Sequence, residues 1–116
     1  MGRLTKRLVE QEPDFEVHAL VGSSDPIERI DRADLVVDLT IPSVSASVVD
    51  AALERGIPVL VGTSGWSADR IDALRAKLRT LPEAAVVIVP NFSLGSAVAT
   101  WLATLAAPHF DSIEIV

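Results

Sequence analysis

The chain has 116 residues, enough for one domain, and its net charge of −6 disfavours binding to nucleic acids or anionic membranes, whose phosphates would repel it. Its hydrophobic content of 49% excludes a disordered polymer, and the absence of cysteine excludes disulfides, thiolate metal sites and a cysteine nucleophile. The two histidines, His18 and His109, are too far apart in sequence to favour a metal site, and no apolar run approaches the length of a membrane span, so we expect a soluble intracellular globular domain.

The first third of the chain predicts a helix, a strand and a loop. The helix is expected to start at residue 2 and to end before Pro13, because proline lacks the amide donor that a helix requires. Residues 15–21 then alternate apolar and polar side chains, which is typical of a β-strand. The segment 22–26 consists of loop residues, and a short helical turn is expected over 27–32.

The rest of the chain alternates strands with helices. Buried parallel strands are predicted at residues 35–39, 57–61 and 85–89, and a last strand at 113–116. The helix after the first of these is expected to be capped by Ser43 and to pack through Val44, Val48, Val49, Ala52 and Leu53. Ser67 is expected to cap the next helix. This alternation predicts an α/β fold with a doubly wound, Rossmann-like parallel sheet.

Small and polar residues end three of the predicted parallel strands. These strand ends are 40–42, 62–65 and 90–95. Glycines let a backbone approach a ligand closely, and hydroxyls and amides just before a helix suit polar or anionic groups. Ligands of open parallel sheets bind at the carboxyl ends of the strands, so the three loops together predict a binding site. Taken singly, each loop is better explained as an ordinary strand-to-helix turn with capping residues.

Two further features bear on this edge of the sheet. Asp38 lies within a predicted strand, where a carboxylate needs hydrogen-bond partners, so it is either tied to nearby loop amides or close to the site. Trp66 and Trp101 are expected to be core or half-buried packing residues.

Three stretches in this order resemble motifs of the 4-hydroxy-tetrahydrodipicolinate reductase (dihydrodipicolinate reductase) family. They are VVDLTIP at 36–42, VGTSGW at 61–66 and VPNFSLG at 89–95. The opening residues 1–4 resemble the end of that family's GxxGR dinucleotide loop, and 110–116 resemble the strand that leads into its HHxxK motif. The resemblance covers essentially the whole chain.

The resemblance implies an NADPH- or NADH-dependent cytoplasmic oxidoreductase of lysine (diaminopimelate) biosynthesis. Hydride would pass to the imine or enamine carbon of a cyclic dicarboxylic acid, and the complete enzyme would be a homotetramer. The implied cofactor-binding residues are Met1, Gly2, Gly62, Thr63, Ser64, Val89, Pro90, Asn91 and Phe92. Ser64 is also implied to touch a substrate carboxylate. No metal is implied, and no nucleic acid or membrane is expected as a partner.

Several parts of the family pattern have no counterpart in this sequence. The first strand with the start of its dinucleotide loop, the HHxxK proton-donor motif, the substrate-binding SGT segment and the C-terminal domain are missing. We therefore expect residues 1–116 to be a partial dinucleotide-binding domain, and we assign no catalytic residue. The alternatives are another Rossmann-type dehydrogenase of amino or imino acids, and a nucleotide-binding module without catalysis.

The loop at 22–26 bears on the choice of cofactor. Dinucleotide folds that prefer NAD place a carboxylate at the end of the second strand, and the family carries one at about the position of Gly22. The nearest carboxylate here is Asp25, while Ser23, Ser24 and Arg29 could meet a 2′-phosphate. We predict that NADPH is used at least as well as NADH. The alternative is that Asp25 folds back to the ribose and preserves a preference for NAD.

Overall fold

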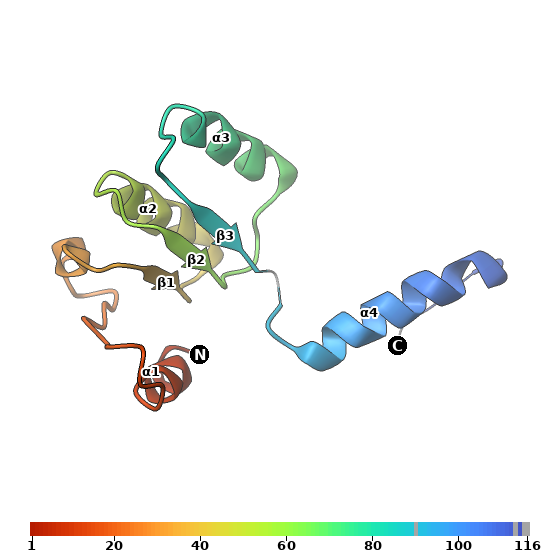
Figure 1. The fold of residues 1–116 in the computed structure, drawn as a ribbon. Helices are drawn as coiled ribbons and strands as arrows, with labels where there is room; N and C mark the ends of the chain where they lie inside the picture. The colour runs from red at the N-terminus through yellow and green to blue at the C-terminus, as the bar shows by residue number, and fades with distance from the viewer. Residues whose placement is uncertain (90, 113, 115–116) are drawn as a thin grey trace.

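The computed structural model describes residues 1–89, 91–112 and 114, and it confirms an α/β fold with a parallel sheet flanked by helices (Figure 1). The helices are α1 (Gly2–Val9), α2 (Pro42–Leu53), α3 (Ala68–Leu78) and α4 (Leu94–Ala106), with short 3-10 turns η1 (Ile27–Ile30) and η2 (Ala107–His109). The strands are β1 (Val36–Asp38), β2 (Val59–Val61) and β3 (Val86–Ile88), in the order β1-β2-β3. No helix among these residues is long and apolar enough to cross a membrane.

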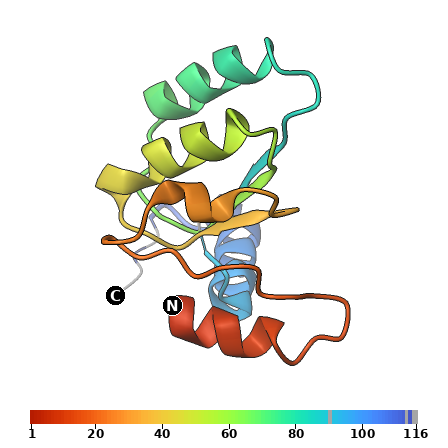
Figure 2. The ribbon, with the colours of Figure 1, turned by 90° about the vertical axis from the view of Figure 1, so that its left-hand side faces the viewer.

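The parallel register aligns the three strand ends. Val36 is paired with Val59, and Asp38 with Val61, which is in turn paired with Ile88. The loops that follow β1, β2 and β3 therefore leave the sheet at one edge. Helices α2 and α3 lie on one face of the sheet and α1 lies on the opposite side (Figures 1 and 2). The side chain of Val87 in β3 faces away from α2 and α3, and it is 57% exposed.

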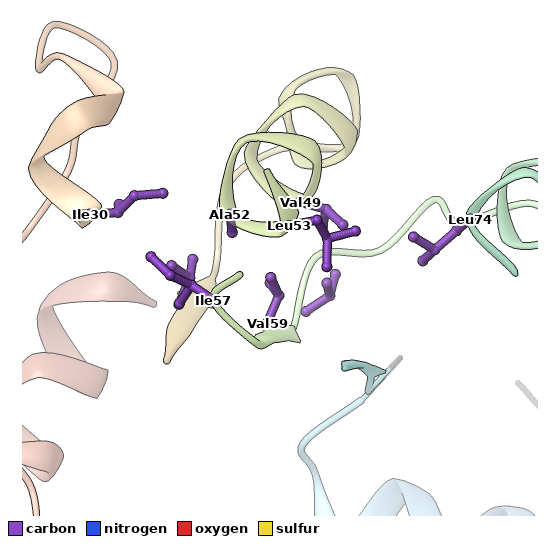
Figure 3. Packing of buried hydrophobic residues seen from close by; sticks show 9 residues of the cluster. Ile30, Val49, Ala52, Leu53, Ile57, Val59 and Leu74 are labelled. Atoms are coloured by element: carbon purple, nitrogen blue, oxygen red, sulfur yellow. The ribbon is translucent and has the colours of Figure 1, made fainter. Parts of the chain in front are cut away.

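The hydrophobic core lies between the sheet and helices α2 and α3 (Figure 3). Its members are Ile30, Val36, Val49, Ala52, Leu53, Ile57, Val59, Val61 and Leu74. Full burial of each valine, leucine or isoleucine contributes roughly 1.5–3 kcal/mol relative to exposure, so these side chains fix α2 on β1 and β2. The predicted packing stripe of α2 was partly wrong, because Val44 is exposed and Ser45 is buried in its place.

Helix α2 also begins earlier than the sequence predicted. Ile41 is its N-cap and Pro42 its first residue, so Ser43 is not the cap. Proline suits this position because the first amides of a helix have no intrahelical acceptor. Ser67 occupies the N-cap position of α3, as expected, but its side chain makes no capping hydrogen bond.

The strand predicted over 15–21 is absent from the structure. No residue of this segment is in a β-strand, and both Phe15 and Leu20 are exposed. Alternation of apolar and polar residues gives the facing of side chains, but a strand also needs a neighbour for its amides and carbonyls. In the described part of the chain this segment belongs to no sheet, and its contact with residue 31 runs through the His18 side chain and not through paired backbones. The last strand, predicted at 113–116, falls outside the described residues except for Glu114.

Helix α4 extends away from the sheet beyond β3 (Figure 1). The helical spacing of Leu94, Val98, Trp101, Leu102 and Leu105 in the sequence predicts this helix, and the structure confirms it. The Ser93 hydroxyl caps it by accepting a hydrogen bond from the Ser96 amide at 3.2 Å. The helix has no buried residue, and Trp101 is 62% exposed. The expectation that Trp101 is a core or half-buried packing residue was therefore wrong. The apolar pattern predicts a helix that packs, but it does not identify the surface that the helix packs against.

Candidate functional site at the strand ends

The three strand-end loops meet at Gly62, the first residue after β2. A methyl group added at Gly62 would overlap the ring of Phe92 and lie 2.7 Å from Leu39 Cδ2. Leu39 follows β1, and Phe92 belongs to the loop that follows β3. Only glycine fits between these side chains without a shift of one of them. The three sequence stretches are therefore in contact, as the parallel topology predicted.

A second glycine joins the first two loops. Gly65 has a φ of +84°, and a methyl group added there would lie 2.8 Å from Cβ of Pro42. Arg70 of α3 donates hydrogen bonds of 2.9 Å to the carbonyls of Gly65 and Pro42. The loop after β2 is thereby held against the start of α2.

Between the two glycines, the neighbouring hydroxyls point in different directions. Thr63 is only 4% exposed, and its Oγ1 donates a hydrogen bond of 3.4 Å to the Asp38 carbonyl. Ser64 is exposed at the tip of the loop. Thr63 and Ser64 are both cofactor-binding residues in the family resemblance. In the structure the Ser64 hydroxyl faces solvent, whereas the Thr63 hydroxyl stabilises the loop.

Asp38 is buried at the end of β1 and fully engaged. It is 1% exposed, and its Oδ1 accepts hydrogen bonds from the Thr40 amide at 3.0 Å and the Thr40 hydroxyl at 2.6 Å. Its Oδ2 accepts a hydrogen bond from the Ser45 hydroxyl. The expectation that the Asp38 carboxylate is tied to loop amides is therefore confirmed. Asp38 also lies at the edge where the three loops meet, so its proximity to a binding site stays a prediction.

The loop after β3 is open to solvent. Val89 extends the sheet by donating its amide to the Val61 carbonyl at 2.8 Å, and Pro90 lies outside the described residues. Asn91 Oδ1 accepts a hydrogen bond from the Ser93 amide at 2.7 Å, which is a local turn interaction. Phe92 is 51% exposed despite its contact with Gly62. Asn91 thus has a structural role, and its exposed amide remains a candidate ligand contact.

The loop at 22–26 is organised around Asp25. Its carboxylate accepts hydrogen bonds of 2.8 Å from the Gly22 amide and from Arg29 Nη1. The Gly22 hydrogen bond, followed by the one from Arg29, lowers the pKa of the Asp25 carboxyl. The Asp25 side chain therefore folds back to Gly22 and is at the same time paired with Arg29.

Comparison with known proteins identifies the family to which the chain belongs. Residues 1–92 match the family described as "Dihydrodipicolinate reductase, N-terminus". The chain belongs to this family. It is 46% identical over 116 residues to the 4-hydroxy-tetrahydrodipicolinate reductase of Clavibacter michiganensis subsp. michiganensis, and 38% identical over 118 residues to that of Streptomyces avermitilis. All of the chain is covered in both cases, but it spans only 42% and 47% of the lengths of these relatives.

Met1 and Gly2, which the resemblance to the dihydrodipicolinate reductase family assigns to the cofactor, do not contact the strand-end loops. Met1 caps α1 and accepts hydrogen bonds from the amides of Leu4 and Thr5. A methyl group added at Gly2 would meet nothing within 4 Å. Neither residue therefore contributes to the cluster around Gly62 in the described structure, and their assignment to the cofactor rests on the resemblance.

Two hollows lie in the described structure, and neither is lined by Gly62, Ser64, Asn91 or Phe92. One, of about 290 Å³, lies between α2 and α3 and is lined in part by Trp66, Arg70 and Lys77. Lys77 is paired with Asp50 there, and Arg70 is engaged with loop carbonyls. The other, of about 480 Å³, lies beside α4 and Phe110. No group of three His, Asp or Glu residues in the described part of the chain could hold a metal.

Sequence reasoning missed two residues of the site, Ser45 and the polar edge of Trp66. Ser45 Oγ accepts a hydrogen bond of 3.1 Å from Trp66 Nε1 while it donates to Asp38. A signal for Ser45 was present, since it continues the buried stripe of Val49, Ala52 and Leu53 at helical spacing. A serine on the core side of a helix needs a polar partner, and the nearest carboxylate that precedes it in sequence is Asp38, in the strand before the helix.

Proposed function

We propose that the complete protein reduces 4-hydroxy-tetrahydrodipicolinate with a nicotinamide dinucleotide, and that this chain supplies most of the cofactor-binding domain. The observation that carries the proposal is the convergence of the three family motifs on Gly62 at the carboxyl edge of a parallel sheet. That edge is where open α/β sheets bind their ligands. Membership of the reductase family supplies the reaction class.

Within this proposal, the loop after β2 borders the nicotinamide half of the cofactor. Gly62, Thr63 and Ser64 form that border, and the exposed Ser64 hydroxyl also reaches a substrate carboxylate. Val89, Pro90, Asn91 and Phe92 contact the nicotinamide and its ribose. The exposed hydroxyl, amide and aromatic face at this edge fit a polar ring with an attached sugar.

Met1 and Gly2 complete the proposed cofactor site as the remainder of the pyrophosphate loop. When bound, the dinucleotide supplies the hydride that reaches an imine or enamine carbon of the cyclic dicarboxylic acid. The residues of this chain bind and orient the reactants, and none of them is assigned the proton transfer. The complete enzyme is proposed to be a cytoplasmic homotetramer.

The proposed cofactor preference is use of NADPH at least as well as NADH. The carboxylate nearest to the 2′-position is Asp25, and Arg29 already compensates its charge. A 2′-phosphate would therefore meet a paired carboxylate and a neighbouring guanidinium, with the loop residues Ser23 and Ser24 beside them. The competing outcome, a preference for NADH, follows if Asp25 leaves Arg29 and binds the ribose hydroxyls.

The decisive experiment uses the purified complete protein. Binding of NADH and NADPH is measured by titration, and turnover of freshly generated cyclic imine is measured by the loss of absorbance of the reduced cofactor. The proposal expects binding and turnover with at least one of the two dinucleotides. Binding without turnover would favour a nucleotide-binding module, and turnover of a different imino or amino acid alone would favour another dehydrogenase.

A further inference from the structure

A directional chain of hydrogen bonds runs beneath the loop after β2. Trp66 Nε1 donates to Ser45 Oγ at 3.1 Å, and Ser45 Oγ donates to Asp38 Oδ2. An indole N–H can only donate and a carboxylate can only accept, so the serine hydroxyl between them must do both. Ser45 is completely buried. The three residues come from the end of the loop, from α2 and from β1.

The loop is fixed at both of its ends by these residues and their neighbours. At its start, the Gly62 amide donates to the Asp38 carbonyl at 2.9 Å. At its end, Arg70 lies 5.1 Å from the centre of the Trp66 ring and donates to the Gly65 carbonyl. The exposed Ser64 lies between these two fixed points. The chain of hydrogen bonds therefore determines where the tip of the loop stands.

We propose that Ser45 and Trp66 are positioning residues for the dinucleotide site. They act through Asp38 and hold Gly62–Gly65 in the conformation that binds the cofactor. This inference rests on the proposed function. Neither side chain is assigned a contact with cofactor or substrate. Their effect is to preorganise the loop, so that its ordering does not have to be supplied when the cofactor binds.

The expected consequence is a selective loss of cofactor affinity. Ser45→Ala leaves Trp66 Nε1 without its acceptor and removes one of the donors to Asp38, which keeps the amide and hydroxyl of Thr40. The apolar neighbours of Ser45 on α2 are unchanged. The fold should therefore remain while the loop samples other positions. A cofactor that binds only one of these positions then loses apparent affinity in proportion to its population.

The test uses the complete protein with Ser45→Ala, Trp66→Phe and the double variant. Ser47→Ala is the matched control, because Ser47 is an exposed serine of the same helix whose hydroxyl donates to the Val44 carbonyl one turn earlier. We expect the dissociation constant of the preferred dinucleotide to rise about tenfold in each single variant, with kcat within about twofold of the unsubstituted value. The double variant should be no weaker than either single variant by more than about twofold, because both remove the same chain of bonds. The control should be unchanged.

Three results would overturn the inference. The first is cofactor affinity in Ser45→Ala equal to that of the unsubstituted protein. The second is a lower melting temperature with unchanged affinity, which would indicate a structural role alone. The third is full additivity of the two substitutions. Each of these results leaves the proposed function standing, because the unsubstituted protein still binds the dinucleotide. Failure of the unsubstituted protein to bind either NADH or NADPH would instead refute the proposed function, and this inference with it.

Discussion

Substitution of Gly62 by alanine tests the packing at the centre of the site. The added methyl group would overlap the ring of Phe92 and lie 2.7 Å from Leu39 Cδ2, well inside van der Waals contact. Leu39 is half-buried, whereas Phe92 is 51% exposed and can move outward. Overpacking of a fitted site costs roughly 1–3 kcal/mol, and the exposed ring keeps this case towards the lower end. We expect Gly62→Ala to lower the free energy of unfolding by about 1–2 kcal/mol.

The assay is denaturant unfolding of the complete protein. Gly95→Ala is the control, since its methyl group would meet nothing closer than Ser93 Oγ at 3.8 Å in the first turn of α4. That change should be neutral or stabilise the protein by up to about 1 kcal/mol, because alanine favours helix over glycine. The double variant Gly62→Ala/Phe92→Ala removes the overlapping ring and should recover most of the loss caused by Gly62→Ala, measured against Phe92→Ala alone. Equal losses with and without Phe92 would refute the packing argument.

Four other predictions concern other features of the molecule. Asn91→Ala should weaken cofactor use by roughly 1–3 kcal/mol, the cost of leaving a bound polar group unpaired; an unchanged cofactor KM with a lower melting temperature would show that Asn91 is only a turn residue. Asp25→Ala should leave Arg29 without its carboxylate and shift the ratio of specificity constants towards NADPH, while a ratio in the unsubstituted enzyme more than about tenfold in favour of NADH would refute the proposed preference. Hydrogen bonds from Gly22 and Arg29 lower the pKa of Asp25 in the folded state. The stability that these bonds contribute is therefore present above the unfolded-state pKa of this carboxyl and is lost as the pH falls through its folded-state pKa. NMR titration of the Asp25 carboxyl measures this pKa. Residues 1–116 expressed alone should aggregate or melt without cooperativity and show no reductase activity, since α4 and the outer face of β3 are exposed; a soluble monomer with a sharp two-state melt would contradict this.

The sequence predicted the elements whose signals are local. Runs of β-branched residues correctly predicted β1, β2 and β3. Each strand in the structure lies within its predicted range and is shorter only at the ends. The segment 15–21 failed because pairing is a property of two strands, whereas alternation is a property of one. For α4, the apolar pattern was correct for a helix but carried no information on its partner.

The candidate site shows the same division between local and tertiary information. The parallel order of the strands was enough to bring the three loops to one edge. The contact between Gly62 and Phe92 depends on the path of a loop and on a side-chain rotamer, which spacing does not encode. Ser45 was overlooked because serine in a helix is usually a surface residue, and its burial becomes informative only when α2 is placed against β1.

Asp38 explains why a buried carboxylate belongs at this point of the sheet. Its side chain accepts from the amide and hydroxyl of Thr40 and from the hydroxyl of Ser45, and its carbonyl accepts from the Gly62 amide. Three donors converge on the two side-chain oxygens, so the position requires a group that only accepts. An asparagine would direct its NH₂ group at one of these donors and leave a buried proton without an acceptor, at a cost of roughly 1–3 kcal/mol. No buried side-chain nitrogen or oxygen in the described part of the chain lacks a partner. A single residue at the end of β1 therefore connects the loop after β1, helix α2 and the loop after β2, and this connection gives the proposed cofactor site its rigid base.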